Sequence, residues 1–393
     1  MKSKYAWIMD SLAKTSFSTK ARAMRHFLIG KKEYLRRKKT RADMDSVIKC
    51  ALCPNMCKFD CPVLAAEKND AMSPSGKTRI AYFIETDRLN SQDAIELMYK
   101  CAGCDACMQW CPFDFSVGDI LKGVREDIAG MSLAPPRIIK IKENLEKNHT
   151  IHERKYDKST DGKGDVLYFM GCEVSSERGE IADSMTKIFE GAGEKYVLLK
   201  DEWCCASPFI NLGFTDEFKK FAEHNVKAIE ESGCRTMVCS CPTCTYVFRH
   251  IYPQFGFEIK ARVMHTSEYL LRLMENKKMA KAIEKECVYH DPCALIRKLG
   301  LEEEPRKIAK RAGMKIKETY FNRKDTKCCG MGCSLGSTNP DIASKMADAR
   351  LEELKKQSDC IVTACPTCNT TFRKGGVEVY DISEIVLKAW EKA

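Results

Sequence analysis

The sequence predicts an α + α/β fold, in which a mostly helical cysteine-rich domain precedes two duplicated small α/β domains. Two observations lead to this prediction. Eight cysteines gather between residues 50 and 111, and a set of five cysteines occurs twice in the remainder of the 393-residue chain. Around each set of five, short apolar runs alternate with amphipathic stretches, the order expected of a small parallel sheet with its connecting helices.

Composition and punctuation divide the chain into five segments. They are a basic N-terminal arm (1–45), the cysteine-rich domain (46–130), a linker (131–164) and two similar domains (165–282 and 283–393). The linker is predicted from Leu133-Ala134-Pro135-Pro136 and from the polar run His149–Gly164. Prolines and charged, glycine-containing stretches disfavour a packed element.

The arm concentrates positive charge. Residues 1–45 contain 13 Lys or Arg against four acidic residues, so they carry +9 of the formal net charge of +10. Such a segment can dock on anionic lipid or on an acidic partner, or it can be a solvated basic helix that aids solubility. It contains no nucleic-acid recognition motif, so we expect no nucleic-acid partner.

The 23 cysteines indicate metal or cluster ligands. The N-terminus lacks the apolar region and cleavage site of a signal peptide, so we expect a reducing compartment, where disulfides are rare. No run approaches the about 18 apolar residues that span a bilayer. We therefore expect a cytoplasmic protein, in contact with the cytoplasmic face of the membrane only peripherally, through the basic arm, or through a partner.

Residues 101–112 contain four cysteines and a proline in the pattern of a cluster-binding motif. Its spacing, C-x2-C-x2-C-x3-C-P, is that of bacterial ferredoxins, in which three thiolates bind one 4Fe-4S cube and the fourth ligates a second cube. A run at residues 50–62 repeats it with one additional residue between its second and third cysteines. We expect one cube on Cys50, Cys53, Cys57 and Cys111, and the other on Cys101, Cys104, Cys107 and Cys61.

Structural zinc sites are the alternative for these eight cysteines, because zinc also uses C-x2-C pairs. Zinc sites do not call for the C-x3-C-P ending, which occurs twice here. Two cubes with exchanged ligands lie close together, so the domain is expected to conduct electrons between a donor and an acceptor.

The two C-terminal domains share five cysteine positions. Cys172 and Cys293 lie 121 positions apart, and the other four pairs lie 124 apart. The first set is Cys172, Cys204, Cys205, Cys241 and Cys244, and the second is Cys293, Cys328, Cys329, Cys365 and Cys368. This regularity indicates duplication of one structural unit.

Each domain is predicted to alternate strands and helices. In the first, we expect strands at 166–170, 196–199 and 236–240 and helices at 177–190 and 216–231. In the second, we expect strands at 288–289, 316–320 and 361–364 and helices at 306–311 and 341–356. Ligands of parallel sheets bind beyond the carboxyl ends of the strands. All five cysteines of each set fall near such ends, so we expect one cluster per domain.

The pattern C-xn-CC-x35-CPTC resembles the cysteine-rich CCG domain. The order of two ferredoxin motifs followed by two such domains resembles the D-type catalytic iron–sulfur subunit of heterodisulfide reductase, over about residues 46–390. Local phrases such as Asp201–Cys205 and His290–Cys293 are similar to that family. The resemblance implies a noncubane 4Fe-4S cluster on each set of five cysteines. It also implies an oxidoreductase that passes electrons from two cubane clusters to these centres and reduces a (hetero)disulfide to thiols.

One position departs from the family pattern. Ala206 follows the first cysteine pair, where the second domain has Gly330. If this position requires a positive φ or a close backbone approach, alanine would distort it. We therefore expect one or two noncubane clusters. Of the remaining cysteines, Cys239, Cys287 and Cys360 are expected to be buried core residues, whereas Cys333 is close enough to the second pair to be an alternate ligand or a redox thiol.

Cleaving a disulfide consumes protons, and His290 is the best-placed titratable group, three residues before Cys293. Histidine is the usual proton donor near neutral pH. The alternative is a structural role, in which Asp291 and Pro292 open the next helix.

Two functions remain open on the sequence. The first is disulfide reduction, with a small-molecule disulfide substrate and a redox partner subunit, either a membrane cytochrome or a flavoprotein. The second is an electron-transfer subunit of a membrane-linked dehydrogenase for glycerol 3-phosphate, glycolate or lactate, in which a flavin partner performs the chemistry. The architecture does not separate them.

Overall fold

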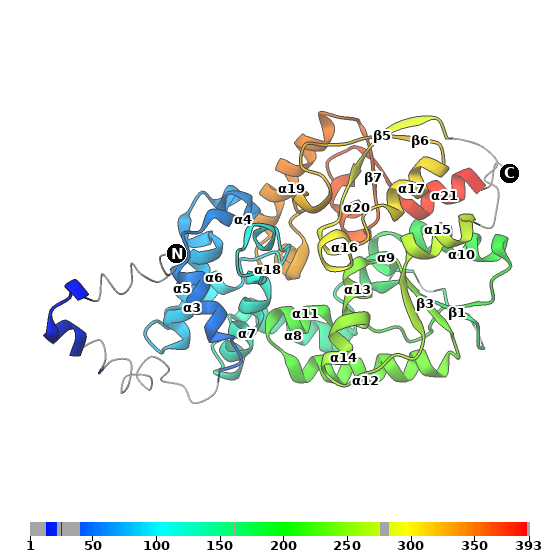
Figure 1. Ribbon diagram of the computed structural model, residues 1–393. Helices are drawn as coiled ribbons and strands as arrows, with labels where there is room; N and C mark the ends of the chain where they lie inside the picture. The colour runs from blue at the N-terminus through cyan, green and yellow to red at the C-terminus, as the bar shows by residue number, and fades with distance from the viewer. Residues whose placement is uncertain are drawn as a thin grey trace.

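A computed structural model describes residues 13–21, 25, 40–153, 155–156, 158–160, 162–275 and 283–390. A helical domain lies beside two α/β units, each built on a four-stranded parallel sheet (Figure 1). The predicted α + α/β class is therefore confirmed. Most of the basic arm lies outside the described residues. In the part of the chain that the structure describes, no helix has the length and apolar character needed to cross a membrane.

The helical domain consists of short helices joined by cysteine-containing loops. Its elements are α3 (Met44–Leu52), η2 (Met56–Asp60), α4 (Pro62–Glu67), η3 (Asp70–Met72), α5 (Pro74–Glu85), α6 (Gln92–Met98), η4 (Cys107–Trp110) and α7 (Val117–Gly130). Side chains of Asp43, Ser73, Ser91 and Ser116 cap α3, α5, α6 and α7 by accepting hydrogen bonds from first-turn amides. The caps of α5 and α7 start these helices beside cysteines, since Pro74 and Val117 border the same hollow as Cys61 and Cys101.

The first α/β unit has the strand order β2-β1-β3-β4. Its strands are β1 (Val166–Phe169), β2 (Tyr196–Val197), β3 (Thr236–Cys239) and β4 (Arg262–His265). Its helices are α9 (Gly171–Glu177), α10 (Gly179–Ala192), α11 (Ser207–Leu212), α12 (Thr215–Glu231), α13 (Pro242–Tyr246), η5 (Val247–Ile251), α14 (Tyr252–Gln254) and α15 (Thr266–Glu275).

The second unit repeats this order as β6-β5-β7-β8. Its strands are β5 (Lys285–His290), β6 (Met314–Lys317), β7 (Cys360–Thr363) and β8 (Glu378–Asp381). Its helices are α16 (Cys293–Lys298), α17 (Glu304–Arg311), η6 (Arg323–Asp325), η7 (Gly332–Ser334), α18 (Leu335–Thr338), α19 (Pro340–Lys355), α20 (Pro366–Arg373) and α21 (Ile382–Trp390). The identical strand order is what duplication of one unit produces.

The structure differs from the sequence-based expectation in the linker, in the outer strands and in several short helices that were not expected. The expected linker contains the helix α8 (Pro136–Asn148), whose Ile138 and Leu145 are buried. Pro136 occupies the first helical turn, where a missing amide donor does no harm, so the prolines begin this helix instead of preventing one. Strands β4 and β8 were not expected, and β6 begins two residues before the expected strand.

A shared apolar core joins the two α/β units. Helices α10 and α15 of the first unit pack against α17 and α21 of the second, as Figure 1 shows at the side remote from the helical domain. One cluster of buried side chains includes Tyr168 and Met185 from the first unit and Tyr289 and Ile308 from the second. Burial of this surface holds the two cysteine sets in a defined relation, because close-packed interiors resist displacement.

The backbone after each cysteine pair adopts a left-handed conformation. Ala206 has φ +67° and Gly330 has φ +93°. A Cβ atom on Gly330 would lie 2.5 Å from the backbone oxygen of Ala343. The position therefore does require a positive φ, and Ala206 adopts it while fully buried. An L-residue with a side chain is destabilised there by about 1–2 kcal/mol.

The two positions predict opposite responses to substitution. Gly330→Ala adds left-handed strain of about 1–2 kcal/mol and a backbone collision, so its melting temperature and its iron content should fall. Ala206→Gly, the matched control, removes strain of the same kind and should keep both. Thermal unfolding and iron analysis check this, and a Gly330→Ala protein as stable as the parent would contradict it.

Candidate functional site

The cysteine sets lie at the switch points of the two sheets. In each sheet, chain connections diverge in opposite directions from the two central strands, β1 and β3 or β5 and β7, and ligands of parallel sheets bind in the crevice at their carboxyl ends. Cys172 follows β1, and Cys241 and Cys244 follow β3. Cys293, Cys365 and Cys368 take the corresponding places after β5 and β7.

The five thiols of the first set form one continuous chain of contacts. Cys204 contacts Cys172 and Cys205, while Cys244 contacts Cys205 and Cys241. The pKa of Cys205 lies well below its ordinary value because Cys204 and Cys244 donate hydrogen bonds to its sulfur. The structure thus brings all five predicted cysteines together and favours a thiolate at the centre of the set.

The second set repeats this arrangement. Cys293 Sγ lies 3.8 Å from Cys328 Sγ, and Cys368 Sγ donates to Cys329 Sγ at 3.3 Å. Cys365 completes the chain through Cys368. The pKa of Cys329 is held well below its ordinary value by hydrogen bonds from Cys328 and Cys368. The two units therefore present equivalent sets of convergent thiols.

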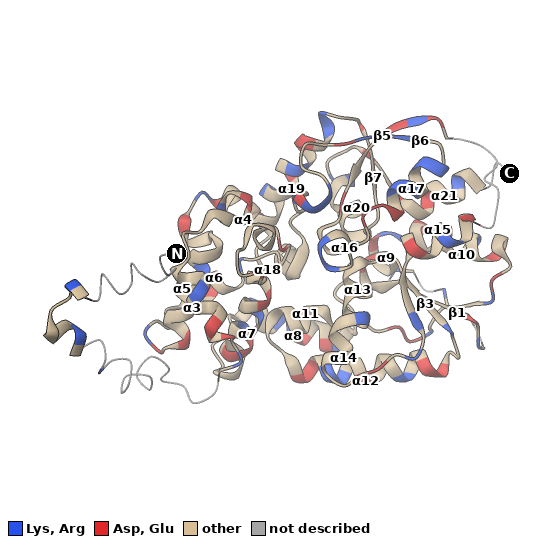
Figure 2. Ribbon diagram, viewed as in Figure 1, with Lys and Arg blue, Asp and Glu red and all other residues tan. Residues whose placement is uncertain are grey.

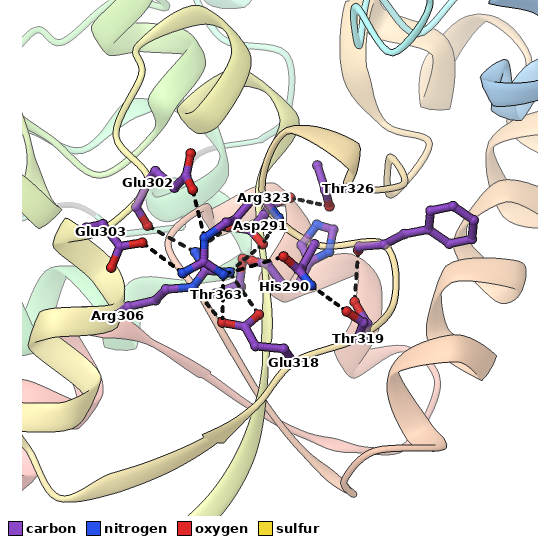
Figure 3. A network of polar contacts seen from close by, with 12 residues as sticks. His290, Asp291, Glu302, Glu303, Arg306, Glu318, Thr319, Arg323, Thr326 and Thr363 are labelled. Carbon is purple, nitrogen blue, oxygen red and sulfur yellow. Dashed lines mark hydrogen bonds and ion pairs between the residues drawn. The ribbon is translucent and has the colours of Figure 1, made fainter. Parts of the chain in front are cut away.

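A buried ion-pair network fixes the two cysteine loops of the second unit (Figure 3). The Asp291 carboxylate accepts from both terminal nitrogens of Arg306, at 2.7 and 2.8 Å, and from the Arg323 amide at 2.8 Å. Thr326 Oγ1 donates to the Asp291 backbone oxygen at 3.0 Å, and Arg306 also binds Glu318. Asp291 precedes Cys293 by two residues and Thr326 precedes Cys328 by two, so one network positions both loops.

The first unit makes the same connection with a different residue. The buried Glu202 carboxylate accepts from the amides of Met170 at 2.9 Å and Gly171 at 2.8 Å. Glu202 lies two residues before Cys204, and Gly171 directly precedes Cys172. Sequence reasoning missed this role of Glu202, although an acidic residue just before a cysteine pair could have suggested it.

The helical domain contains two cysteine-lined spaces. The outer site, defined by Cys50, Cys53, Cys57 and Cys111, surrounds a cavity of about 310 Å³. The inner site, defined by Cys61, Cys101, Cys104 and Cys107, surrounds a smaller hollow of about 20 Å³. Burial raises the pKa of Cys50 to about 11 and that of Cys57 to about 12. The outer cavity is much larger than a single metal ion requires, and its four thiols fit the ligand chemistry of a cube.

The inner site touches the second cysteine set. A Cβ atom on Gly103 would lie 3.0 Å from Cys333 Sγ, and one on Gly332 would lie 2.4 Å from the Ala102 backbone oxygen. The Cys328 thiol donates to Cys104 and lowers the pKa of Cys104 to about 6. The inner cysteines and the second set are therefore immediate neighbours.

The second set in turn adjoins the first, because the Cys365 side chain acts on Cys241 across the boundary between the units and lowers its pKa. The four sites follow one another as outer site, inner site, second set and first set. The exchanged ligands predict that the outer and inner sites are neighbours. No spacing indicates that the inner site adjoins the second set or that the two sets meet, since these contacts join residues more than 100 positions apart.

His290 lies at the end of β5 and is fully buried. Its Nδ1 accepts a hydrogen bond from Arg350 Nε at 3.2 Å, and Nε2 has no hydrogen-bond partner among the described residues. Burial, together with the charge of Arg350, holds its pKa well below the ordinary value. The imidazole is consequently neutral near pH 7, with its hydrogen on Nε2.

The remaining cysteines divide by position. Cys239, Cys287 and Cys360 lie in strands and are buried, as core residues would be. Cys333 is half-buried in a left-handed conformation, with its sulfur 3.6 Å from Arg125 Nη1.

Comparison with known families identifies all three domains. Residues 46–115 match the 4Fe-4S dicluster domain Fer4_8, and residues 166–249 and 287–373 each match the cysteine-rich domain CCG. Together these matches contain every cysteine of the four sites.

Several relatives share this organisation. One subunit of the dihydromethanophenazine:CoB–CoM heterodisulfide reductase from Methanosarcina barkeri is 26% identical over 317 residues, 74% of this chain and 78% of that protein. One subunit of the fumarate reductase (CoM/CoB) from Methanothermobacter marburgensis is 28% identical over 354 residues, 85% of this chain and 71% of that protein. The EtfAB:quinone oxidoreductase of Syntrophomonas wolfei is 25% identical over 336 residues, 75% of this chain and 47% of that protein.

Proposed function

Because this chain belongs to the iron–sulfur oxidoreductases that join a 4Fe-4S dicluster domain to two CCG cysteine-rich domains, we propose that it reduces a disulfide to two thiols between its two five-cysteine sets. The observation that carries the proposal is the contact of Cys241 with Cys365, by which the two sets face each other. A disulfide lying between them would present one sulfur to each set.

The cysteines of the four sites are the proposed ligands. In the ferredoxin manner, the outer and inner sites would each hold a cubane 4Fe-4S cluster, and each set of five would hold a noncubane 4Fe-4S cluster. Convergent thiols at every site and the volume of the outer cavity support this assignment. When bound, such clusters accept and release electrons one at a time.

The reaction RS–SR′ + 2 e⁻ + 2 H⁺ → RSH + R′SH requires two single-electron deliveries. The order of the sites supports delivery from the outer site through the inner site to the second set. The protein's own residues hold the ligands in place and exclude water, since Cys204, Cys205, Cys328 and Cys329 are all buried. Within each unit, the Asp291 or Glu202 network holds the loop of the first cysteine against the loop of the cysteine pair.

Iron analysis and spectroscopy test this function. Protein purified without oxygen should contain about 16 irons per chain, from four 4Fe clusters. Addition of a thiol to the oxidised protein should produce a new electron paramagnetic resonance signal. Cys365→Ser should abolish the thiol-dependent signal, whereas Cys360→Ser, which alters a buried cysteine outside the sets, should keep it. About eight irons and no response to thiols from fully reconstituted protein would refute disulfide chemistry.

A relay role is the second candidate, favoured by the relationship to an EtfAB:quinone oxidoreductase. In that case a flavoprotein dehydrogenase for glycerol 3-phosphate, glycolate or lactate would perform the chemistry, and this chain would carry the electrons. Copurification with a flavoprotein, together with no thiol production from a chemical reductant by the isolated chain, would establish it over disulfide reduction.

Proton donation by His290 stays a prediction. A buried, neutral imidazole that accepts from Arg350 also suits a positioning role. If His290 supplies a proton, His290→Gln should lower the rate of thiol formation about 10²–10⁴-fold at unchanged iron content and should alter the pH–rate profile. A rate within twofold of the parent would leave His290 with a structural role.

The partner protein is proposed to dock over the outer site. Three large, strongly exposed apolar side chains line this cavity: Met56 (68%), Trp110 (59%) and Phe113 (49%). Leu52 (80%) and Phe59 (77%), also exposed, lie within two residues of its cysteines in the chain. Patches of this kind mark interaction surfaces. The occupant is inferred to be a protein, because similar chains are named as subunits of reductases and the outer site is the last in the order leading away from the facing sets. Association with the cytoplasmic face of the membrane would follow from this partner or from the basic arm.

Charged substitutions in this patch should weaken the partner contact. Leu52→Lys combined with Phe59→Glu is expected to reduce partner affinity at least tenfold, about 1.4 kcal/mol, and to leave reduction by a small chemical reductant unchanged. Tyr320→Lys, which alters an 88% exposed side chain of the second unit, is the matched control. Undiminished copurification of the partner with the double variant would exclude this docking site.

A further inference from the structure

A buried lysine lines the inner site. Lys77 of α5 is 1% exposed and borders the same hollow as Cys61, Cys101 and Cys104. Its ammonium group forms no hydrogen bond or ion pair with any described residue. A buried charge costs several kcal/mol unless an opposite charge compensates it. An anionic group bound in the inner hollow would compensate the charge of Lys77.

Two arginines add positive charge around the same cysteines. Arg125 of α7 is fully buried, and its Nε and Nη1 donate to the backbone oxygens of Met98 at 2.8 Å and Asn211 at 2.6 Å. Its Nη2 has no hydrogen-bond partner among the described residues. Arg125 and Lys77 both act electrostatically on Cys101. The other contacts of Arg125 are with the Cys333 sulfur at 3.6 Å and with the face of the Tyr99 ring, so no carboxylate among the described residues pairs with its charge.

Arg297 of α16 approaches from the second unit. It donates to the backbone oxygens of Cys104 at 2.8 Å, Lys324 at 2.9 Å and Thr326 at 2.5 Å. Among the described residues, no carboxylate pairs with Lys77, Arg125 or Arg297. Figure 2 marks basic residues in all three contributing helices, α5, α7 and α16.

The acidic side chain that lines the inner hollow does not cancel these charges. Asp105 lines the inner hollow, but its carboxylate pairs with Lys298 at 3.1 Å and accepts a hydrogen bond from Ser116. Asp105 and Lys298 together are neutral. Beside the inner site, three cations therefore have no carboxylate partner among the described residues, and two of them are essentially fully buried.

Within the described part of the chain, the outer site lacks charged side chains of this kind. The described residues that line its cavity are cysteines, apolar side chains, Asn55 and Ser75, and none of them is charged. Arg79 acts on Cys50, but it is an exposed residue that donates to the Ala51 backbone oxygen at 2.8 Å. Water and salt screen an exposed charge far more than a buried one.

From this asymmetry we propose that Lys77, Arg125 and Arg297 raise the reduction potential of a cube at the inner site above that of a cube at the outer site. The inference rests on the proposed cube ligands. A cube with four thiolates is anionic and becomes more so when it gains an electron, so neighbouring cations stabilise the reduced form. One electron passes from the reduced outer site to the oxidised inner site, and no proton or bond is involved. Electrons entering from the partner thus collect beside the Cys104–Cys328 contact.

A redox titration followed by electron paramagnetic resonance tests the proposal independently of disulfide reduction. Lys77→Met keeps the length of the side chain and removes its charge. It should shift the midpoint potential of the inner cube to more negative values and leave that of the outer cube nearly unchanged. In the half-reduced protein, the ratio of inner to outer reduced cubes should fall at least tenfold. The inner signal is identified as the one altered by Cys101→Ser.

Two control variants separate charge from structure. Lys77→Arg retains the charge and should retain the parent potential. Arg79→Met removes one exposed charge beside the outer site and should shift the outer potential less than Lys77→Met shifts the inner one. An inner potential in Lys77→Met equal to that of the parent would overturn the proposal. If Lys77→Met loses the inner cube, Arg297→Met decides in the same titration, where an unchanged inner potential is again the contradicting result. Failure of thiol formation would not affect this readout, so the two proposals fail separately.

Discussion

The close approach of two glycine-containing loops is the constraint on which the rest of the molecule depends. Gly332 leaves no room for a Cβ beside the Ala102 backbone oxygen, and Gly103 leaves little beside Cys333. Any larger side chain at these points would separate the inner cysteines from the second set. Electron transfer weakens steeply with distance. Glycine at positions 103 and 332 therefore keeps the helical domain close enough to the α/β units for the proposed electron transfer between them. The shared core of the two α/β units then extends the same geometry to the first set.

The duplicated units show how one positional requirement can be met by different chemistry. Each unit must hold the loop of its first cysteine against the loop of its cysteine pair. The second unit uses a carboxylate from the first loop, Asp291, fully engaged by Arg306 and a backbone amide. The first uses a carboxylate from the pair loop, Glu202, on two backbone amides. In both cases every charge is hydrogen-bonded, which is the condition under which a buried polar network specifies a unique arrangement.

Among the described residues, exposure and charge differ between the outer site and the inner site. At one end, the outer site is flanked by exposed apolar side chains and is lined by uncharged groups. Further in, the inner site lies beside the buried cations Lys77 and Arg125, and beyond it the cysteine pairs of the two sets are buried. Exposure suits contact with another protein, and burial strengthens every electrostatic interaction because the surroundings screen it less. Under the proposed function, entry and storage of electrons would thus be favoured at different places for separate physical reasons.

The sequence by itself determined those features that depend on short spacing. Cysteine intervals predicted both kinds of site. Local apolar periodicity predicted six of the eight described strands and the helices α10, α12, α17 and α19 to within a few residues, because helix faces and strand faces repeat over a few positions. It misjudged α8, since prolines that start a helix and prolines that end one look alike without the packing of Ile138 and Leu145.

Only the tertiary structure decided which sites touch. Lys77, Arg125 and Arg297 are separated by up to 220 positions, yet they surround one group of cysteines. Cys241 and Cys365, 124 positions apart, meet across a boundary between units. These contacts result from the burial of apolar surface between domains. That driving force is non-directional and acts between residues at any separation along the chain, so no local pattern records it.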